Sequence, residues 1–442
     1  MRTVISDSKP LLNGASRQSV VSSEYSRSKH GRTPVRAVLS FGILMGLVMV
    51  IYFAAIAPRA PLAWDLQAYY EAGAAVMAGE PFIGLQPEIG GGEYVYPPIV
   101  VLGFVPYGLF SSWEIPFAIH ALVNLSLLGA LAWVTLRELE YLGVPIARAD
   151  RVLIVAFCVA SLYPLMNLGL GQVDPFITLL ITMVFIGVER RRDHLAGTAL
   201  AIAGIIKLFP IAIGIWLLYQ RRWRAIATAF LVGVLAILVS LFVFGLQTNQ
   251  AYVELILFER SRLQAFAEGL SPDFFSISLI RPISTLMQGL PPITFLIVSV
   301  ALVAPILWFI YQRTTTRVDR HVAYLATLIA VIIALPSSNF NHLLYLYFPL
   351  IVLFYSLRPG RTRRLLLTGM VVMLIPIQPG IITATLESLA LSAEFVELVS
   401  AVTNDVLSFA SIALIGTIIL LGACVHHANQ TAQTDRTFRK VD

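Results

Sequence analysis

Long apolar stretches alternate with short polar segments along most of the chain. A helix that crosses the hydrocarbon core of a bilayer needs about 20 mainly apolar residues. Ten stretches approach that length, and they are 37–57, 114–136, 152–166, 175–188, 225–244, 291–311, 322–336, 343–357, 365–379 and 405–424. Several are too short for a full crossing, so their helices must continue into the flanking segments. The pattern predicts an all-α integral membrane protein: a polytopic bundle of about 10–12 transmembrane helices, with membrane-lying and re-entrant short helices.

The composition excludes a soluble globular protein. Of the 442 residues, 57% are hydrophobic and only 13% are charged, and the mean hydropathy is +0.80. Soluble domains carry about 25% charged residues. We expect one transmembrane domain over residues 37–424, a disordered basic cytoplasmic tail at 1–36, and a second cytoplasmic tail at 425–442. Cys158 and Cys424 lie in apolar stretches and suggest neither a disulfide framework nor a metal site.

The basic residues set the orientation, because cytoplasmic loops of membrane proteins are enriched in Lys and Arg. With the N-terminus inside, 26 of the 31 basic residues fall on the cytoplasmic side. The exceptions are Arg59, Arg260, Arg262 and Arg281 in outer loops and Lys207 in an apolar stretch. We therefore expect a multi-pass protein of the inner (plasma) membrane with both termini in the cytoplasm. The net charge of +6 is explained by these cytoplasmic basic residues, so it does not indicate a nucleic-acid-binding protein.

Two segments break the regular alternation of crossings. Residues 195–219 are apolar apart from Lys207, yet arginine clusters flank both ends, and 25 residues are too few for two crossings. This pattern predicts two half-helices that enter the membrane from the cytoplasm and return, with a break near Pro210. A single crossing is the alternative. Residues 98–110 are also too short to span and are expected to lie on the outer face. The sequence Ser-Ser-Trp-Glu at 111–114 is then expected to form a capping box at the start of the next helix.

The outer face is predicted to consist of five loops, at 58–97, 167–174, 245–290, 337–342 and 380–404. Loops 58–97 and 245–290 are long enough to form a site, and long ordered loops are often functional.

Asp65 precedes residues with helical spacing in the first of these loops. It fits a helix N-cap, which accepts backbone N–H bonds, and equally a general base at the mouth of a membrane cavity. Both roles are compatible.

Lys207 and His342 are the other polar residues of interest. Lys207 is the one lysine outside the two tails, and a charge at membrane depth costs about 2.5–3.5 kcal/mol on insertion scales. It either snorkels to an interface or faces an internal cavity as a partner for an anionic group. His342 lies at the outer boundary, where a histidine is commonly a structural residue. The sequence contains no Asp-x-Asp pair, no phosphate-binding P-loop and no His-Glu-x-x-His motif, so neither a metal nor a cofactor is predicted.

A series of short polar motifs follows one another along the chain. They are Asp65-x-x-x-Tyr69-Tyr70-x-Ala72, Gly79-Glu80-Pro81, Tyr94-x-Tyr96-Pro97-Pro98, Gly171-Gln172-Val173-Asp174, Lys207-x-x-Pro210, Arg221-Arg-Trp-Arg224 and Asn341-His342. Taken in this order, the motifs resemble glycosyltransferase family 87, a family of the GT-C superfamily, and the resemblance covers roughly residues 60–360. The chain departs from the family in two places. Asp273-Phe-Phe-Ser276 replaces an Asn-Gln-Ser stretch, and Asn341-His342 replaces a histidine doublet.

The resemblance implies a GT-C-like fold and a membrane hexosyltransferase. The donor would be a polyprenyl-phosphate sugar, with mannose expected, and the acceptor a lipid or glycan on the extracytoplasmic face. Asp65 would be the general base of a metal-independent, inverting displacement. His342 and Lys207 would contact phosphate or substrate, with Arg260, Arg262 and Arg281 as further cations. The motif residues Tyr69, Tyr70, Tyr96, Gln172, Asp174 and Asn341 complete the expected substrate-binding set.

Two other classes of protein remain compatible with the composition. A transporter or flippase of a lipid-linked substrate is the main alternative, but transporters often contain paired broken helices, and only one broken hairpin is evident here. An inactive membrane scaffold is the other. Membrane lipids, the sugar donor and the acceptor are the expected partners, and no oligomeric state is predicted.

Overall fold

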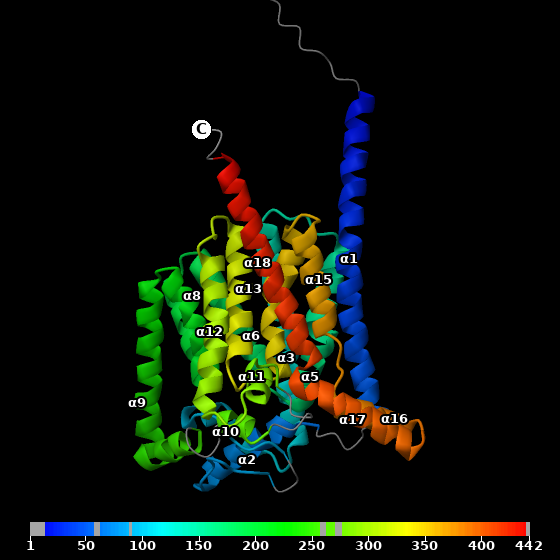
Figure 1. The fold of residues 1–442 in the computed structure, drawn as a ribbon. Coiled ribbons are helices and arrows are strands. Elements are labelled where there is room, and N and C mark those ends of the chain that lie inside the picture. The colour runs from blue at the N-terminus through cyan, green and yellow to red at the C-terminus, as the bar shows by residue number, and fades with distance from the viewer. Residues whose placement is uncertain (1–13, 57–61, 88–90, 257–261, 270–275, 439–442) are drawn as a thin grey trace, which may run out of the picture.

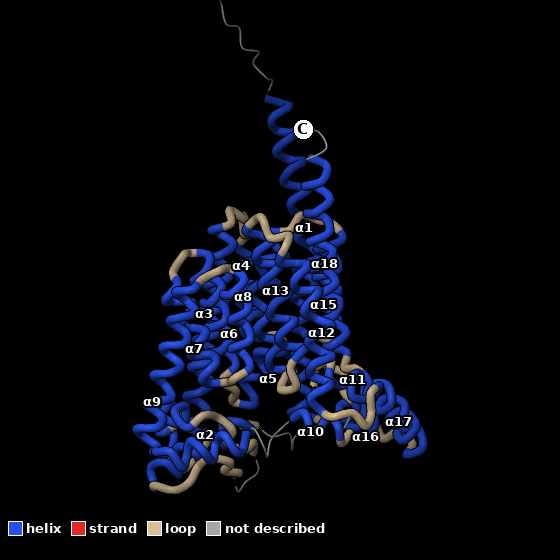
Figure 2. The backbone as a smooth tube through the Cα atoms, turned by 60° about the vertical axis from the view of Figure 1, so that its left-hand side comes forward, coloured by secondary structure: helices blue, strands red, loops and turns tan. Residues whose placement is uncertain are grey.

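The computed structural model describes residues 14–56, 62–87, 91–256, 262–269 and 276–438. The described part of the chain is helical and contains no β-strand (Figure 2). Its elements are α1 (Gly14–Ala55), α2 (Trp64–Ala78), η1 (Pro98–Gly103), η2 (Val105–Leu109), α3 (Glu114–Tyr141), α4 (Arg148–Ala160), α5 (Leu162–Leu170), α6 (Asp174–Glu189), α7 (Asp193–Ile206), η3 (Phe209–Ile213), α8 (Gly214–Tyr219), α9 (Trp223–Glu254), α10 (Arg262–Ala267), α11 (Ile280–Leu286), α12 (Pro292–Tyr311), α13 (Arg317–Ala334), η5 (Phe340–Leu346), α14 (Tyr347–Ser356), α15 (Arg361–Met373), α16 (Pro379–Ser388), α17 (Ala393–Phe409) and α18 (Ile412–Phe438).

Most helices run side by side between two ends of the bundle (Figure 1). The start of α1 and the end of α18 project from one end, which we call the arginine end. The short helices α2 and α10 lie at the other, which we call the α2 end. At the arginine end, the guanidinium of Arg317 lies 3.3 Å from both Glu138 and Glu189, two carboxylates that are almost fully buried. Arg190 and Arg320 extend this network. Paired charges lower the cost of burying these groups where the bundle meets water.

The predicted membrane architecture is confirmed. Within the described residues, six helical stretches are long and apolar enough to cross a membrane, and α6, α13, α15 and η5–α14 are shorter or more polar. The six are Arg32–Ala55, Glu114–Tyr141, Arg148–Leu170, Trp223–Glu254, Pro292–Tyr311 and Ala393–Ala432. α9 exposes large apolar side chains along most of its length, as expected of a helix that faces lipid, whereas α13 is almost entirely buried.

Two expected boundaries differ in the structure. The helix that contains the run 37–57 already begins at Gly14, and Arg32 and Arg36 pair with the buried Asp150 at 3.3 and 2.7 Å. Ordered structure therefore starts before residue 37, because these ion pairs hold α1 to α4. The run 405–424 also proves to be two elements. The chain leaves the helix at Ala410, so that only α18 continues toward the arginine end, while α16 and α17 lie at the α2 end (Figure 1).

Residues 195–219 enter the bundle and return, as predicted. α7 ends at Ile206, and η3 and α8 lead back to the arginine end. Asp193 and Arg222, at the two ends of the hairpin, lie 3.6 Å apart, and Arg222 also donates to the carbonyl of Val188 at 2.9 Å. The tip of the hairpin is thereby directed toward the middle of the bundle, and Lys207 lies at this tip.

The segment 98–110 forms two short 3₁₀ helices that pack on α2. Gly73 and Gly108 allow this close approach, because a Cβ on Gly73 would lie 2.3 Å from the carbonyl oxygen of Phe104. The predicted capping box at 111–114 is wrong. α3 starts at Glu114 itself, Trp113 is its N-cap, and no side chain caps the helix. The predicted pattern placed Glu114 at the third position of the helix, whereas it occupies the first.

Candidate active site

The turn between α5 and α6 positions the first charged group. Gly171 has a left-handed backbone (φ +69°) that ends α5, and Asp174 and Pro175 then begin α6. An acidic residue and a proline are both favourable in a first helical turn. The carboxylate of Asp174 is completely buried at this position.

Lys207 neutralises the buried carboxylate. α7 ends there, and the extended backbone of Lys207 (φ −132°, ψ 129°) directs the residue away from the helix. Its ammonium donates to the two oxygens of Asp174 at 2.9 and 2.8 Å and to Oε1 of Gln172 at 3.2 Å. A lysine has three N–H donors, so these three acceptors satisfy it. Of the two predicted alternatives for Lys207, the structure shows the interior one, and the anionic partner is Asp174.

The 3₁₀ helix η5 contributes a phenol and an imidazole to the same place. The hydroxyl of Tyr345 donates to Oδ1 of Asp174. His342 is 3% exposed, and its ring lies 4.4 Å from that of Phe209, measured between centroids. Nδ1 of His342 accepts the backbone N–H of Asn339 at 3.1 Å, so in the neutral ring the proton lies on Nε2.

Asp65 reaches the site from the first turn of α2. The N-cap of this helix is Ala63, so the alternative in which Asp65 is the N-cap residue is wrong. Ala63 donates to the carbonyl of Gly169 at 2.8 Å, which attaches the start of α2 to the end of α5. Asp65 is half-buried, whereas Asp174 is fully buried. Of the two carboxylates, Asp65 is therefore the one that a substrate can reach.

Two buried tyrosines lie near both carboxylates. The hydroxyls of Tyr69 and Tyr96 share a hydrogen bond of 2.7 Å, and the ring of Tyr69 stacks on Phe104 at 4.4 Å. Burial raises the pKa of both phenols well above the usual range. The nearby charges of Asp65 and Asp174 raise the pKa of each phenol further. Both tyrosines are thus neutral hydrogen-bonding groups, and both carboxylates lie near them.

A glycine-rich loop covers Asp65. Gly92 donates to the carbonyl of Trp64 at 2.8 Å. A Cβ on Gly92 would lie 3.2 Å from the indole nitrogen of Trp64 and 3.5 Å from Oδ1 of Asp65. The loop can approach this closely because position 92 has no side chain.

A second set of contacts fixes the turn that holds Gln172. Nε2 of His120 and Nδ2 of Asn124 both donate to the carbonyl of Gln172, at 3.2 and 2.8 Å. Since Nε2 of His120 faces an acceptor, its Nδ1 accepts from the hydroxyl of Tyr107 at 3.0 Å. Sequence reasoning missed these three residues, and it also missed Tyr345. Tyr345 follows His342 by three residues, a helical spacing that could have revealed it.

The remaining predicted residues have other surroundings. The hydroxyl of Tyr70 donates to the carbonyl of Phe110 at 3.0 Å, which attaches α2 to the end of η2. Arg281 is buried, and its Nε donates to the carbonyl of Ser408 at 3.0 Å, in the last turn of α17. A cation is favourable at a helix C-terminus. Asn341 lines a neighbouring cavity. Arg260 lies outside the described residues, and Arg262 begins α10.

The site therefore combines one accessible carboxylate, a neutralised buried carboxylate, neutral phenols and an imidazole. A carboxylate in reach of a substrate can remove a proton from a hydroxyl, and the phenols and imidazole can bind oxygen atoms. Within the described residues, no group of three or more His, Cys, Asp or Glu side chains is arranged to hold a metal ion.

Comparison with known proteins agrees with the resemblance drawn from the motifs. The sequence model of glycosyltransferase family 87 matches residues 94–338, which is more than half of the chain. Asp65 precedes that range, and His342 follows it closely. A curated relative from Mycolicibacterium smegmatis is the polyprenol-phosphate-mannose-dependent alpha-(1-2)-phosphatidylinositol pentamannoside mannosyltransferase. The two are 27% identical over 164 residues, which cover 37% of this chain and 38% of the relative's length. By the extent of the family match, the chain belongs to glycosyltransferase family 87.

Proposed function

We propose that this membrane glycosyltransferase moves a hexose, mannose in the first instance, from a polyprenyl-phosphate carrier to a hydroxyl of a lipid or glycan acceptor. The observation that carries the proposal is the position of Asp65. It is a half-buried carboxylate near the hydrogen-bonded Tyr69–Tyr96 pair, which also lies near Asp174, in a chain of family 87. The activity of the mycobacterial relative, which depends on polyprenol-phosphate-mannose, supports the choice of donor.

The proposed reaction is a single displacement. Asp65 takes the proton of the acceptor hydroxyl while its oxygen attacks the anomeric carbon. The bond from that carbon to the phosphate oxygen breaks on the opposite face, so the configuration inverts, and polyprenyl phosphate leaves. A positioned base of this kind contributes about 10²–10⁴-fold to the rate.

The other polar groups have supporting roles in this proposal. Lys207 neutralises the charge of Asp174 and, through its bond to Gln172, holds the turn between α5 and α6. Its three N–H donors are already used in these contacts, so we assign it no direct contact with the substrate. His342 is a candidate to bind the leaving phosphate, because its imidazole adjoins Tyr345, which donates to Asp174. Hydrogen bonds to a departing phosphate lower the barrier most when their donors are held in place beforehand.

Orientation follows from the same proposal. The arginine end would face the cytoplasm under the positive-inside rule, and the α2 end, with Asp65, would face the opposite side of the plasma membrane. The sugar of the donor would be extracytoplasmic while its lipid chain stays in the bilayer.

A direct assay tests the proposed function. Purified protein in lipid vesicles is given radiolabelled polyprenyl-phosphate mannose, a matched glucose donor, and a panel of glycolipid acceptors. We expect label to appear in an acceptor at a rate that a divalent-metal chelator leaves unchanged. Absence of transfer from every donor would contradict the proposal, as would movement of intact donor across the vesicle membrane without transfer. A rate abolished by the chelator would contradict its metal independence.

A further inference from the structure

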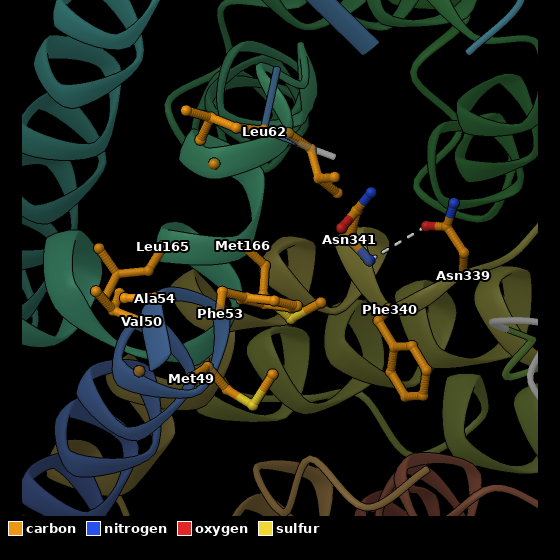
Figure 3. A pocket seen from close by; sticks show the side chains of 13 residues that line it. Met49, Val50, Phe53, Ala54, Leu62, Leu165, Met166, Asn339, Phe340 and Asn341 are labelled. Atoms are coloured by element: carbon orange, nitrogen blue, oxygen red, sulfur yellow. Dashed lines mark hydrogen bonds between the residues drawn. The ribbon is translucent and has the colours of Figure 1, made fainter. Parts of the chain in front are cut away.

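An apolar cavity of about 560 Å³ lies beside the candidate site, between α1, α5 and the segment 339–341 (Figure 3). Its walls are mainly aliphatic and aromatic, and they include Met49, Phe53, Leu62, Met166 and Phe340. Ligand-binding pockets typically have volumes of about 300–1,000 Å³ and are mostly apolar. The volume and lining fit a small molecule or part of a lipid.

The cavity is accessible from the surface of the bundle. Three lining residues, Val50, Phe53 and Leu62, are 49%, 38% and 55% exposed. On α1 the lining runs from Gly46 to Ala54, a stretch of about 12 Å at 1.5 Å per residue. Because α1 is long and apolar enough to cross a membrane, an opening along it would face the hydrocarbon region of the bilayer. A lipid chain could move into the cavity from the side without passing through water.

One end of the cavity is polar and adjoins the candidate site. Asn341 is only 6% exposed, and its carboxamide points toward the space beside Leu62 (Figure 3). In the part of the chain that the structure describes, no group makes a hydrogen bond with that carboxamide, which lines the cavity. The next residue is His342. On the other wall, Gly169 accepts a hydrogen bond from Ala63, two residues before Asp65.

We infer that this cavity holds the first isoprene units of the polyprenyl chain of the sugar donor. The inference rests on the proposed function and specifies the donor's binding site within it. In such a donor the isoprenoid chain is bonded directly to the phosphate. Its apolar binding site must therefore begin beside the phosphate-binding groups. The cavity meets this requirement, because its polar end is formed by Asn341, next to His342.

An acceptor glycolipid fits this position less well. Its acyl chains are separated from the reacting hydroxyl by a glycan headgroup, so they would lie at a distance from Asp65 and His342. The carboxamide of Asn341, which has no partner among the described residues, is available for an oxygen of the donor phosphate. The geometry thus favours the chain that is attached to the leaving group.

Photo-crosslinking tests the occupant without relying on turnover. The probe is a polyprenyl phosphate with a diazirine in the isoprene units nearest the phosphate, added to the full-length protein in vesicles. We expect adducts within residues 46–54 and 165–170, and we expect unlabelled polyprenyl phosphate to compete with the probe. Adducts confined to other helices would overturn the inference, as would competition by a diacyl glycolipid but not by polyprenyl phosphate.

A pair of matched variants tests the same inference in the transfer assay. Ala54 lines the cavity, whereas its exposed neighbour Ala55 does not. Filling the cavity with Ala54→Trp removes the burial of several methylene groups, so the KM for the donor should rise at least about tenfold. The acceptor KM and the Tm should stay unchanged, and Ala55→Trp should have no effect on either KM. Equal effects of the two variants, or a rise in the acceptor KM alone, would overturn the inference. If the wild-type protein transferred no sugar, the proposed function would fail, and the cross-links would still decide what the cavity binds.

Discussion

Single residues at the candidate site divide into those that face a substrate and those that hold the site together. Asp65 is half-buried and covered by a glycine-rich loop, which keeps a carboxylate accessible in a confined space. Asp174 is also a carboxylate, but it is neutralised by Lys207 and bound by Tyr345. Two carboxylates near the same pair of tyrosines thus have different surroundings, and only the first is suited to accept a proton.

We expect the Lys207–Asp174 pair to stabilise the folded protein and to make no direct contact with the substrate. Removing one member of a buried ion pair leaves the other charge uncompensated and typically costs about 3–5 kcal/mol. We therefore expect Lys207→Met to lower the thermal stability in detergent markedly. The double variant Lys207→Met with Asp174→Leu should recover part of the loss, because no charge is then left unpaired.

A double-mutant cycle of melting temperatures provides this measurement, and donor KM is determined for the variants that remain folded. A Lys207→Met protein as stable as the wild type, with a much higher donor KM, would instead assign Lys207 to direct contact with the donor.

Tyr69 and Tyr96 are expected to stay protonated wherever the enzyme is active. Burial raises the pKa of each phenol, so the folded protein binds these protons more tightly than the unfolded chain. Their contribution to stability is present below about pH 10, the pKa of an unfolded tyrosine, and decreases as the pH rises above it.

The Tyr96→Phe variant should therefore leave the pH dependence of transfer unchanged from about pH 5 to 9. It removes the 2.7 Å hydrogen bond to Tyr69, which should cost about 1 kcal/mol of stability. Loss of an acidic or alkaline limb of the rate profile in this variant would identify a tyrosine as the titrating group.

At the scale of elements, the site depends on how α2 is attached to the membrane helices. Gly171 touches α2, since a Cβ at this position would lie 2.6 Å from Cβ of Leu66, next to Asp65. Its left-handed backbone also ends α5 immediately before Gln172 and Asp174. One small residue therefore sets the distance between the helix of Asp65 and the turn of Asp174.

The Gly171→Ala substitution should impair transfer more than its effect on stability explains. A non-glycine residue with a left-handed backbone costs about 1–3 kcal/mol, and here the added methyl also displaces Leu66. Gly79→Ala is the matched control. Gly79 has a similar φ of +75°, but a Cβ added there would have nothing within 4 Å. We expect both variants to melt at lower temperature and only Gly171→Ala to lose most of its turnover. Equal turnover in the two would show that the contact with Leu66 does not position Asp65.

For the whole molecule, the arrangement of charges predicts the orientation in the membrane. Both ends of the hairpin 193–222 lie at the arginine end, and Glu80 lies at the opposite end, beside α2. The native Cys158 and Cys424 are buried, so introduced cysteines can be labelled without background.

We expect cysteines at positions 192 and 224 to be protected from an impermeant thiol reagent in intact cells, and a cysteine at position 80 to react. After the cells are opened, all three should react. Labelling of 192 and 224 on opposite sides would contradict the hairpin, and labelling of both from outside would reverse the orientation.

The hydrophobic pattern predicts the membrane helices because lipid requires continuous apolar surface. It could not separate α17 from α18, since hydropathy stays high through the break at Ala410. Asp65, Asp174 and Lys207 could be predicted as candidates from local motifs. The pairing of Lys207 with Asp174 and the contacts of His120 and Asn124 with Gln172 join residues more than 30 positions apart. Only tertiary structure reveals such contacts.

The central claim is that Asp65 is the base of a sugar transfer, and the most direct test is the turnover of Asp65→Asn. The amide preserves the size of the side chain but cannot take the proton. Glu71→Gln, the same change on the same helix, is the control. With both variants folded and equally stable, we predict that Asp65→Asn loses about 10²–10⁴-fold in turnover and that Glu71→Gln stays close to wild type. An Asp65→Asn protein that keeps more than about a tenth of wild-type turnover would contradict the account.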